Sequence, residues 1–181
     1  MLQLLQYLLT VILYQSKYGA TKQYAKWLAD QTGFSMVETK KADIEQIKVF
    51  DTVILGGGIY ASGIAGLSFL RKHMDVLQDK KLVVFCVGAS PFEKTAFQEI
   101  VKHNMKDALQ NIPCFYCRGA WDLEKMSFVD RTLCKLLQKS VAKKSYNELE
   151  TWQKALAEAG NQSCDWTDPA YLKPILQYLE P

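Results

Sequence analysis

The 181-residue sequence has little excess charge of either sign. It contains 22 Lys and Arg against 19 Asp and Glu, for a net charge of +3. The lysine pairs at 40–41, 80–81 and 143–144 lie far apart, whereas a nucleic-acid-binding face needs a concentrated basic stripe. We therefore expect no nucleic-acid partner, and we expect these lysines to lie on solvated surface.

Long apolar runs are also lacking. Residues 1–14 are apolar but too short to cross a bilayer, and they have neither a positively charged start nor a small-residue cleavage site. We expect no integral membrane segment and no secretory signal. The end of this run is expected to form the first strand, whereas residues 1–7 are either an extra turn or the product of an ill-chosen start codon.

Cysteine and histidine are few and form no metal pattern. Five cysteines in a chain of this size are typical of reduced thiols in a cytoplasmic protein. Cys114 and Cys117 have the spacing of a redox pair, but they fall in a predicted strand, where positions i and i+3 point to opposite faces. No second cysteine pair completes a zinc site, and no hydroxyl has a histidine partner to activate it. We expect no metal and identify no catalytic residue.

Strand-like and helix-like runs alternate over the first two thirds of the chain. Strands are predicted at 10–14, 34–38, 51–55, 81–87 and 112–117, and helices at 22–31, 67–77 and 92–109. Residues 82–87 are apolar at every position, which is typical of a parallel sheet covered by helices on both faces. The sequence therefore predicts a single α/β domain over residues 1–181.

The last third is predicted to be helical. Helices are expected at 126–138 and 147–159, and Asp168 followed by Pro169 is typical of a helix start. We expect a helical insertion at about 122–163, after the fifth strand. The apolar stripes of its two helices are expected to pack in the core instead of anchoring on a membrane.

Three loops follow the carboxyl ends of predicted parallel strands, at 15–21, 56–63 and 88–91. Ligands of open α/β sheets bind at this edge, so we expect the loops to form one crevice. The first loop has hydroxyl groups and Gly19, and it opens a helix whose free N–H groups and dipole suit a phosphate. The alternative is an ordinary turn capped by Thr21.

The second loop combines four glycines, three of them consecutive, with Tyr60. Glycines allow main-chain amides to lie against a flat ligand, and Tyr60 offers a face for stacking. The alternative is a flexible turn in which Tyr60 only packs. The loop also matches the dinucleotide fingerprint G-x-G-x-x-A, but no following strand carries a ribose-binding acid, and no G-x-x-x-x-G-K-[ST] sequence indicates a nucleotide triphosphatase.

Residues 14–21, Tyr-Gln-Ser-Lys-Tyr-Gly-Ala-Thr, resemble the flavodoxin phosphate loop T-x-T-G-x-T, with Tyr18 in place of a threonine. Residues 53–60, 119–122 and 165–168 extend the likeness over about residues 9–179. The pattern is similar to the flavodoxin-domain proteins that include the menaquinone-dependent protoporphyrinogen dehydrogenases. This resemblance implies FMN and a doubly wound, five-stranded parallel sheet of order 2-1-3-4-5.

The resemblance also implies where FMN would lie. The phosphate would sit on the first loop and the flavin ring between the second and third loops, with Tyr60 stacking on it. Trp121 and Asp122 would lie near the same rim, although Trp121 is as readily read as core packing. The implied cofactor-binding residues are Ser16, Lys17, Tyr18, Gly19, Ala20, Thr21, Gly57, Gly58, Ile59, Tyr60, Ala61, Ser62, Gly88, Ala89, Ser90 and Trp121.

Three functions remain open at this point. The first is an FMN oxidoreductase that acts on a substrate or quinone, with protoporphyrinogen as one candidate, and the second is an electron carrier that docks on redox proteins. Carrier flavodoxins are typically acidic, so the slightly basic charge favours the enzyme. A domain that has lost its cofactor is the third, and Ser16, Gly19 and Thr21 argue against it. The expected partners are an electron donor and acceptor, and a homodimer is left open.

Overall fold

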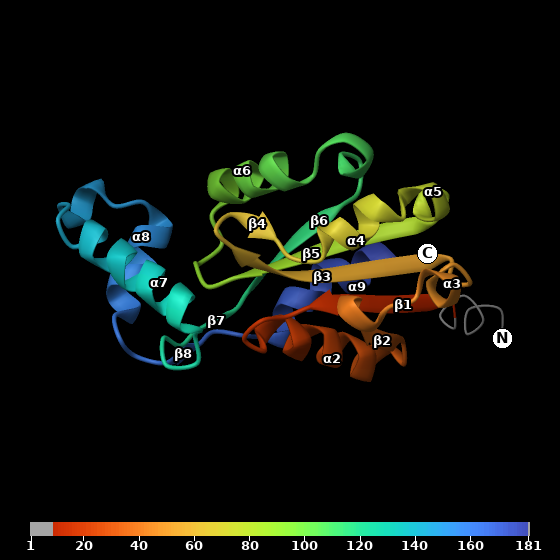
Figure 1. Cartoon of the computed structure of the whole chain (residues 1–181), viewed down its shortest axis with the longest axis horizontal. Helices are drawn as coiled ribbons and strands as arrows, with labels where there is room; N and C mark the ends of the chain where they lie inside the picture. The colour runs from red at the N-terminus through yellow and green to blue at the C-terminus, as the bar shows by residue number, and fades with distance from the viewer. Residues whose placement is uncertain (1–8, 181) are drawn as a thin grey trace.

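A parallel sheet forms the middle layer of the computed structural model, which describes residues 9–180 (Figure 1). The expectation for residues 1–7 lies outside that range. The main strands are β1 (Thr10–Gln15), β2 (Ser35–Glu38), β3 (Thr52–Tyr60), β5 (Lys81–Gly88) and β6 (Cys114–Arg118). Their order is β2-β1-β3-β5-β6, and the short β4 (Gly63–Ile64) pairs antiparallel with β3 alone. The predicted order 2-1-3-4-5 is therefore confirmed for the five parallel strands.

Helices cover both faces of the sheet, which explains why its strands are apolar at every position (Figure 1). One face is covered by α2 (Ala20–Thr32) and by the 3₁₀ turn η4 (Pro169–Leu172) with α9 (Lys173–Leu179). The other face is covered by α3 (Ile44–Ile47), α4 (Leu67–Lys72), α5 (Met74–Leu77) and α6 (Lys94–Asn104). Cys117 is buried in the core on the α2 and α9 face, and Cys114 packs against the core on the opposite face. Their predicted placement on opposite faces is confirmed.

Two predicted helices are shorter than expected. The run 67–77 is broken at His73, whose backbone is not helical (φ −115°, ψ 21°), and this separates α4 from α5. The run 92–109 gives only α6 and a 3₁₀ turn at Asp107–Leu109. Glu93 sets the start of α6, because its carboxylate accepts the N–H groups of Thr95 and Ala96.

The glycine run belongs to strand β3 and not to a loop, so the prediction of a loop at 56–63 is wrong. A Cβ on Gly56 would overlap the ring of Phe85, and one on Gly57 would overlap the carbonyl oxygen of Ala65. Both glycines are buried. They are needed because the backbone is approached closely by its neighbours inside the protein.

The helical insertion extends beyond the carboxyl ends of the strands (Figure 1). It contains α7 (Phe128–Val141), a 3₁₀ turn (Tyr146–Glu148) and α8 (Thr151–Ala159), and it is joined to the sheet by the pair β7 (Ala120–Trp121) and β8 (Cys164–Asp165). No helix within residues 9–180 is long and apolar enough to cross a membrane. A small core of the insertion forms around Val141, Leu149 and Leu156.

The expectation that the apolar stripes of both insertion helices are core is wrong for α7. Phe128, Val129, Leu133 and Leu136 of this helix are exposed. In α8, by contrast, Leu156 and the neighbouring alanines are buried as expected. The small core of the insertion packs on only one side of α7, so the other side of the helix is exposed to solvent.

Candidate functional site

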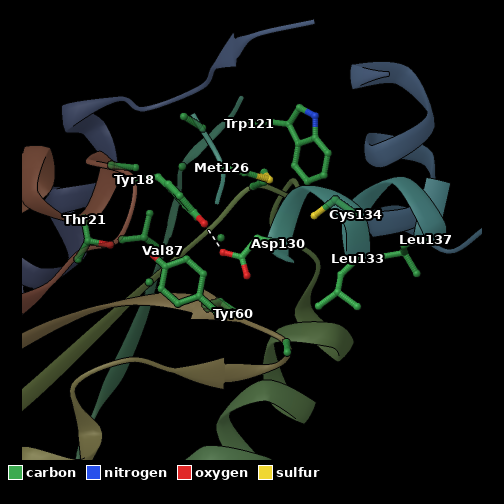
Figure 2. Close-up of a pocket in the computed structure, with 18 residues that line it drawn as sticks. Tyr18, Thr21, Tyr60, Val87, Trp121, Met126, Asp130, Leu133, Cys134 and Leu137 are labelled. Atoms are coloured by element: carbon green, nitrogen blue, oxygen red, sulfur yellow. Dashed lines mark hydrogen bonds between the residues drawn. The ribbon is translucent and has the colours of Figure 1, made fainter. Parts of the chain in front are cut away.

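A cavity of about 480 Å³ lies at the carboxyl edge of the sheet, between the strand ends and α7 (Figure 2). Residues from the three segments predicted as loops contribute to it, and α7 forms the far wall. The lining residues are Tyr18, Ala20, Thr21, Gly58, Ile59, Tyr60, Ala61, Val87, Gly88, Ala89, Gly119, Ala120, Trp121, Met126, Asp130, Leu133, Cys134 and Leu137. Most of these side chains are apolar or aromatic. The arrangement suits a ligand that is largely flat and apolar.

The first loop directs main-chain N–H groups at the start of α2. Gly19 has φ +103° and forms the N-cap of the helix without a side-chain cap, and its own N–H donates to Ser16 Oγ at 3.1 Å. Within residues 9–180, the N–H groups of Tyr18, Ala20, Thr21 and Lys22 have no hydrogen-bond acceptor. Because these groups coincide with the positive end of the helix dipole, they form an anion site made of backbone.

Thr21 places a hydroxyl group in the cavity beside these amides (Figure 2). The residue is only 2% exposed, yet its hydroxyl makes no hydrogen bond to any residue that the structure describes. No buried side-chain nitrogen or oxygen among the described residues lacks a hydrogen-bond partner, so the Thr21 oxygen is itself accessible from the cavity. This hydroxyl is thus suited to bind a polar group of a ligand, together with the free amides.

Tyr60 closes the cavity from the side of β3. Its ring packs over Gly58, where a Cβ would overlap the phenol group, and it meets the ring of Tyr18 edge to face at a centroid distance of 6.1 Å. The Tyr60 hydroxyl accepts the main-chain N–H of Lys17 at 2.9 Å. Burial raises the pKa of Tyr60 above its ordinary value. The residue is therefore a neutral phenol at physiological pH.

The turn between β3 and β4 has a strained backbone at the cavity rim. Ala61 (φ 46°) and Ser62 (φ 66°) are the two central residues of the hairpin that pairs Tyr60 with Gly63. Two positive φ angles define a type I′ turn, which normally takes glycine or asparagine. Asn104 holds it in place, since its side chain accepts the Ile64 N–H (2.9 Å) and donates to the Ser62 carbonyl (2.7 Å). Strain at such a rim is typical of binding sites.

Asp130 of α7 is a site residue that the sequence interpretation missed. Its carboxylate accepts a hydrogen bond from the Tyr18 hydroxyl (Figure 2) and another from Lys17 Nζ, so it joins α7 to the first loop. The Lys17 ammonium, followed by the Tyr18 hydroxyl, lowers the pKa of this carboxyl below its ordinary value. The two partners lie more than a hundred residues before it, and no local motif links such positions.

A second, smaller hollow of about 100 Å³ adjoins the main cavity. It shares Trp121 with the cavity, and Trp152 and Trp166 complete its aromatic lining. The Arg118 guanidinium lies 4.3 Å from the centroid of the Trp166 ring, and Arg118 Nε donates to the Ala89 carbonyl at 3.3 Å. This hollow, called the tryptophan annex below, offers room for a second apolar group beside the cavity.

The predicted site residues do not all reach the cavity. Those in its lining are Tyr18, Ala20, Thr21, Gly58, Ile59, Tyr60, Ala61, Gly88, Ala89 and Trp121. Gly19 faces a neighbouring hollow of about 260 Å³ on the other side of the loop, and Ser90 lines the tryptophan annex. Four predicted residues line none of these hollows: Ser16, Lys17, Gly57 and Ser62. Hydrogen bonds of Ser16, Lys17 and Ser62 nevertheless fix the geometry of the rim. The wall formed by α7 could not be placed from sequence.

The two residues after the fifth strand have separate roles. Trp121 packs on the small core of the insertion, as one of its two readings had it, and it also lines the cavity. Its contact with a flavin or a substrate stays a prediction. The Asp122 carboxylate instead accepts the N–H of Glu124 and the hydroxyl of Ser163, which fixes the turn into α7. Residues 9–180 contain no cluster of three or more His, Cys, Asp or Glu that could hold a metal.

Comparison with known families agrees with this geometry. The family model described as flavodoxin domain matches residues 11–148. The chain belongs to the flavodoxin domain family. The matched residues of this flavodoxin domain include the first loop, β3, β5 and α7, and thus every wall of the cavity.

The flavodoxin domain is also similar to solved structures, at low identity. A WrbA-like flavodoxin protein from Agrobacterium tumefaciens is 18% identical over 67% of this chain and 87% of its own, with a TM-score of 0.45. A putative flavoprotein from Bacteroides eggerthii is 15% identical over 70% and 96%, with a TM-score of 0.46. The Trp repressor binding protein from Bacillus subtilis is 16% identical over 61% and 83%, with a TM-score of 0.43. No curated protein sequence matches the chain. Similarity at this level assigns no function.

Proposed function

We propose that this flavodoxin domain binds FMN in the cavity and is an oxidoreductase. The observation that carries the proposal is the unpaired Thr21 hydroxyl beside the free N–H groups at the start of α2, both open to an apolar cavity. The residues present fit FMN, since a phosphate matches the backbone anion site and a flat ring matches the apolar walls. Tyr18 to Thr21 would hold the phosphate, and Tyr60 would lie against the ring.

Bound FMN would supply one-electron and two-electron transfer, and the chain would bind, orient and shield it. The third loop is rigid, because the Tyr116 hydroxyl is hydrogen-bonded to the carbonyls of Gly88 (3.0 Å) and Ser90 (2.5 Å). The strained turn at Ala61 and Ser62 fixes the opposite rim. Helix α7 forms the far wall of the cavity. These features would orient a ring between the two rims and α7.

An enzyme is favoured over a carrier because the cavity has space beyond the cofactor. The tryptophan annex opens from the same cavity, and its three indole rings suit an apolar, ring-shaped second reactant. A quinone ring has this character, whereas protoporphyrinogen, the other candidate, is too large for the annex alone. A carrier that docks on redox proteins needs an exposed flavin edge and has no use for such an annex. The electron donor and acceptor are thus proposed to be small molecules.

Two measurements test the proposal in sequence. Titration of the full chain with FMN should quench flavin fluorescence with 1:1 stoichiometry and raise the Tm. The loaded protein, reduced photochemically without oxygen, should then be reoxidised by a soluble menaquinone analogue, and protoporphyrinogen should be tested as the reductant. Absence of FMN binding would overturn the cofactor assignment. Reoxidation by a redox protein but not by the quinone would favour the carrier.

A further inference from the structure

Helix α7 exposes a strip of large apolar side chains. Phe128 is 83% exposed, Val129 64%, Leu133 60% and Leu136 57%, and these four residues are called the α7 strip below. Their spacing of one, four and three residues places them on one side of a helix. Monomeric soluble proteins rarely expose such contiguous apolar groups unless they bind something there. The strip therefore indicates a docking surface.

The charges next to the α7 strip have one sign. Between residues 128 and 144 the chain has five basic residues, Arg131, Lys135, Lys139, Lys143 and Lys144, and one acidic residue, Asp130. Asp130 is bonded to Lys17 and Tyr18 on the cavity side. The Arg131 guanidinium donates to main-chain carbonyls before the helix. The remaining charges of this segment are thus lysines, of which Lys135 and Lys139 lie beside Phe128 on the helical wheel.

We propose that the α7 strip docks on an anionic lipid surface, with α7 lying in the plane of the interface. An apolar helix face bordered by lysines is typical of such interfacial helices. The apolar side chains would enter the acyl boundary, while the long lysine side chains reach the lipid phosphates. The net positive charge of this segment complements an anionic leaflet.

A second copy of the chain fits the strip less well. A two-fold interface brings the same patch of both subunits together, so the lysines of both copies would lie in one interface. Like charges at an interface are unfavourable, and no exposed carboxylate of α7 offsets them. The same charges that repel a second copy attract an anionic bilayer.

The strip is continuous with the cavity wall. Leu133 belongs to the strip and also lines the cavity, and Leu137 beside it lines both the cavity and the tryptophan annex (Figure 2). Asp130 ties the helix to the first loop, so α7 is held in a fixed direction. Docking would bring the cavity next to the bilayer, where an apolar reactant dissolved in lipid has a short path to it.

Vesicle flotation of the full chain tests the inference without flavin, so its failure is separate from failure of the proposed function. We expect binding to vesicles of phosphatidylcholine with phosphatidylglycerol, and at least tenfold weaker binding to phosphatidylcholine alone. The double variant Phe128→Ser with Leu136→Ser, and the double variant Lys135→Gln with Lys139→Gln, should each weaken binding to anionic vesicles at least tenfold. Matched controls are Val49→Ser with Val76→Ser and Lys40→Gln with Lys41→Gln, which alter exposed residues elsewhere and should bind as the parent does.

Circular dichroism should show that all four double variants remain folded, because each changes only exposed side chains. The inference is overturned if the parent fails to bind anionic vesicles, binds both vesicle types equally, or binds no better than the strip variants. It is also overturned if sedimentation velocity shows a dimer that Phe128→Ser with Leu136→Ser abolishes while vesicle binding is absent.

Discussion

The Tyr60 hydroxyl accepts the main-chain N–H of Lys17 at 2.9 Å, and this bond joins the ends of β3 and β1. One amide of the proposed phosphate loop is therefore held by the protein itself, while the amides of Tyr18, Ala20 and Thr21, which line the cavity, have no acceptor among the described residues. Tyr60 was predicted either to stack on the flavin ring or only to pack in a flexible turn. Its hydroxyl also orders the loop that would bind the phosphate, so the two ends of the proposed cofactor site are coupled through one side chain.

Replacing Tyr60 should separate these two roles. Tyr60→Phe keeps the ring but leaves the Lys17 N–H without its acceptor, a loss of about 1 kcal/mol, so we expect FMN affinity to fall about fivefold. Tyr60→Ala also removes the stacking surface and should weaken FMN at least tenfold. Flavin fluorescence titration measures both. Tyr146→Phe, which removes a surface hydroxyl bonded to Glu158, is the control and should bind as the parent does; equal affinity of Tyr60→Phe and parent would contradict the coupling.

Thr21→Val should reveal whether the cavity hydroxyl binds the phosphate. The change keeps the side-chain shape and removes one donor, and a hydrogen bond to a charged group is worth about 1.5–3 kcal/mol. FMN affinity should therefore fall about tenfold to a hundredfold, whereas riboflavin, which has no phosphate, should bind unchanged. Thr95→Val, an exposed change on α6, provides the matched control. Equal losses for FMN and riboflavin would place this hydroxyl near the ring and not near the phosphate.

The strained turn predicts that replacing Ser62 with glycine stabilises the protein, although glycine usually destabilises. Ser62 has φ 66°, where an L-residue is disfavoured by about 1–2 kcal/mol and glycine is not. After the entropy of glycine in the unfolded chain is subtracted, Ser62→Gly should stabilise by about 0.5–1 kcal/mol and raise Tm by about 2–3 °C. Ala157→Gly on the exposed side of α8 should lower Tm by a similar amount. If both variants lowered Tm, the turn would not be strained.

The strands and the first loop could be predicted because their signals are local. Residues 10–14 are apolar at every position and end at a Ser, Gly and Thr turn, and both features depend on neighbours in sequence. The glycines after Leu55 look the same in the sequence whether a ligand or the Phe85 ring packs against them. Only the positions of Phe85 and Ala65, fixed by sheet packing, show that Gly56 and Gly57 are needed for space inside the protein.

The wall of the cavity could not be predicted because its contacts span distant parts of the chain. Asp130 meets Lys17 and Tyr18 only after the whole sheet has formed. The apolar stripe of α7 was assigned to the core since periodicity shows which side chains share a face, and not what covers that face. The insertion has too few residues to cover it, which becomes evident only in three dimensions.

The contact of Asp130 with Lys17 and Tyr18 predicts a pH-dependent closure of the cavity. The pKa of Asp130 is lowered in the folded protein, mainly by Lys17 and then by Tyr18, so the charged carboxylate is favoured when α7 is docked. Its contribution is complete above the ordinary aspartate pKa of about 3.9 and is lost as the pH falls through the lower folded value. Acidification below about pH 4 should therefore loosen α7 from the first loop.

Amide hydrogen exchange of residues 128–141 should accelerate below about pH 4 in the parent, and Asp130→Asn should already show that faster exchange at neutral pH. Glu124→Gln, an exposed change nearby, should exchange as the parent does; protection of α7 that is the same in Asp130→Asn and parent at neutral pH would show that Asp130 does not hold the helix.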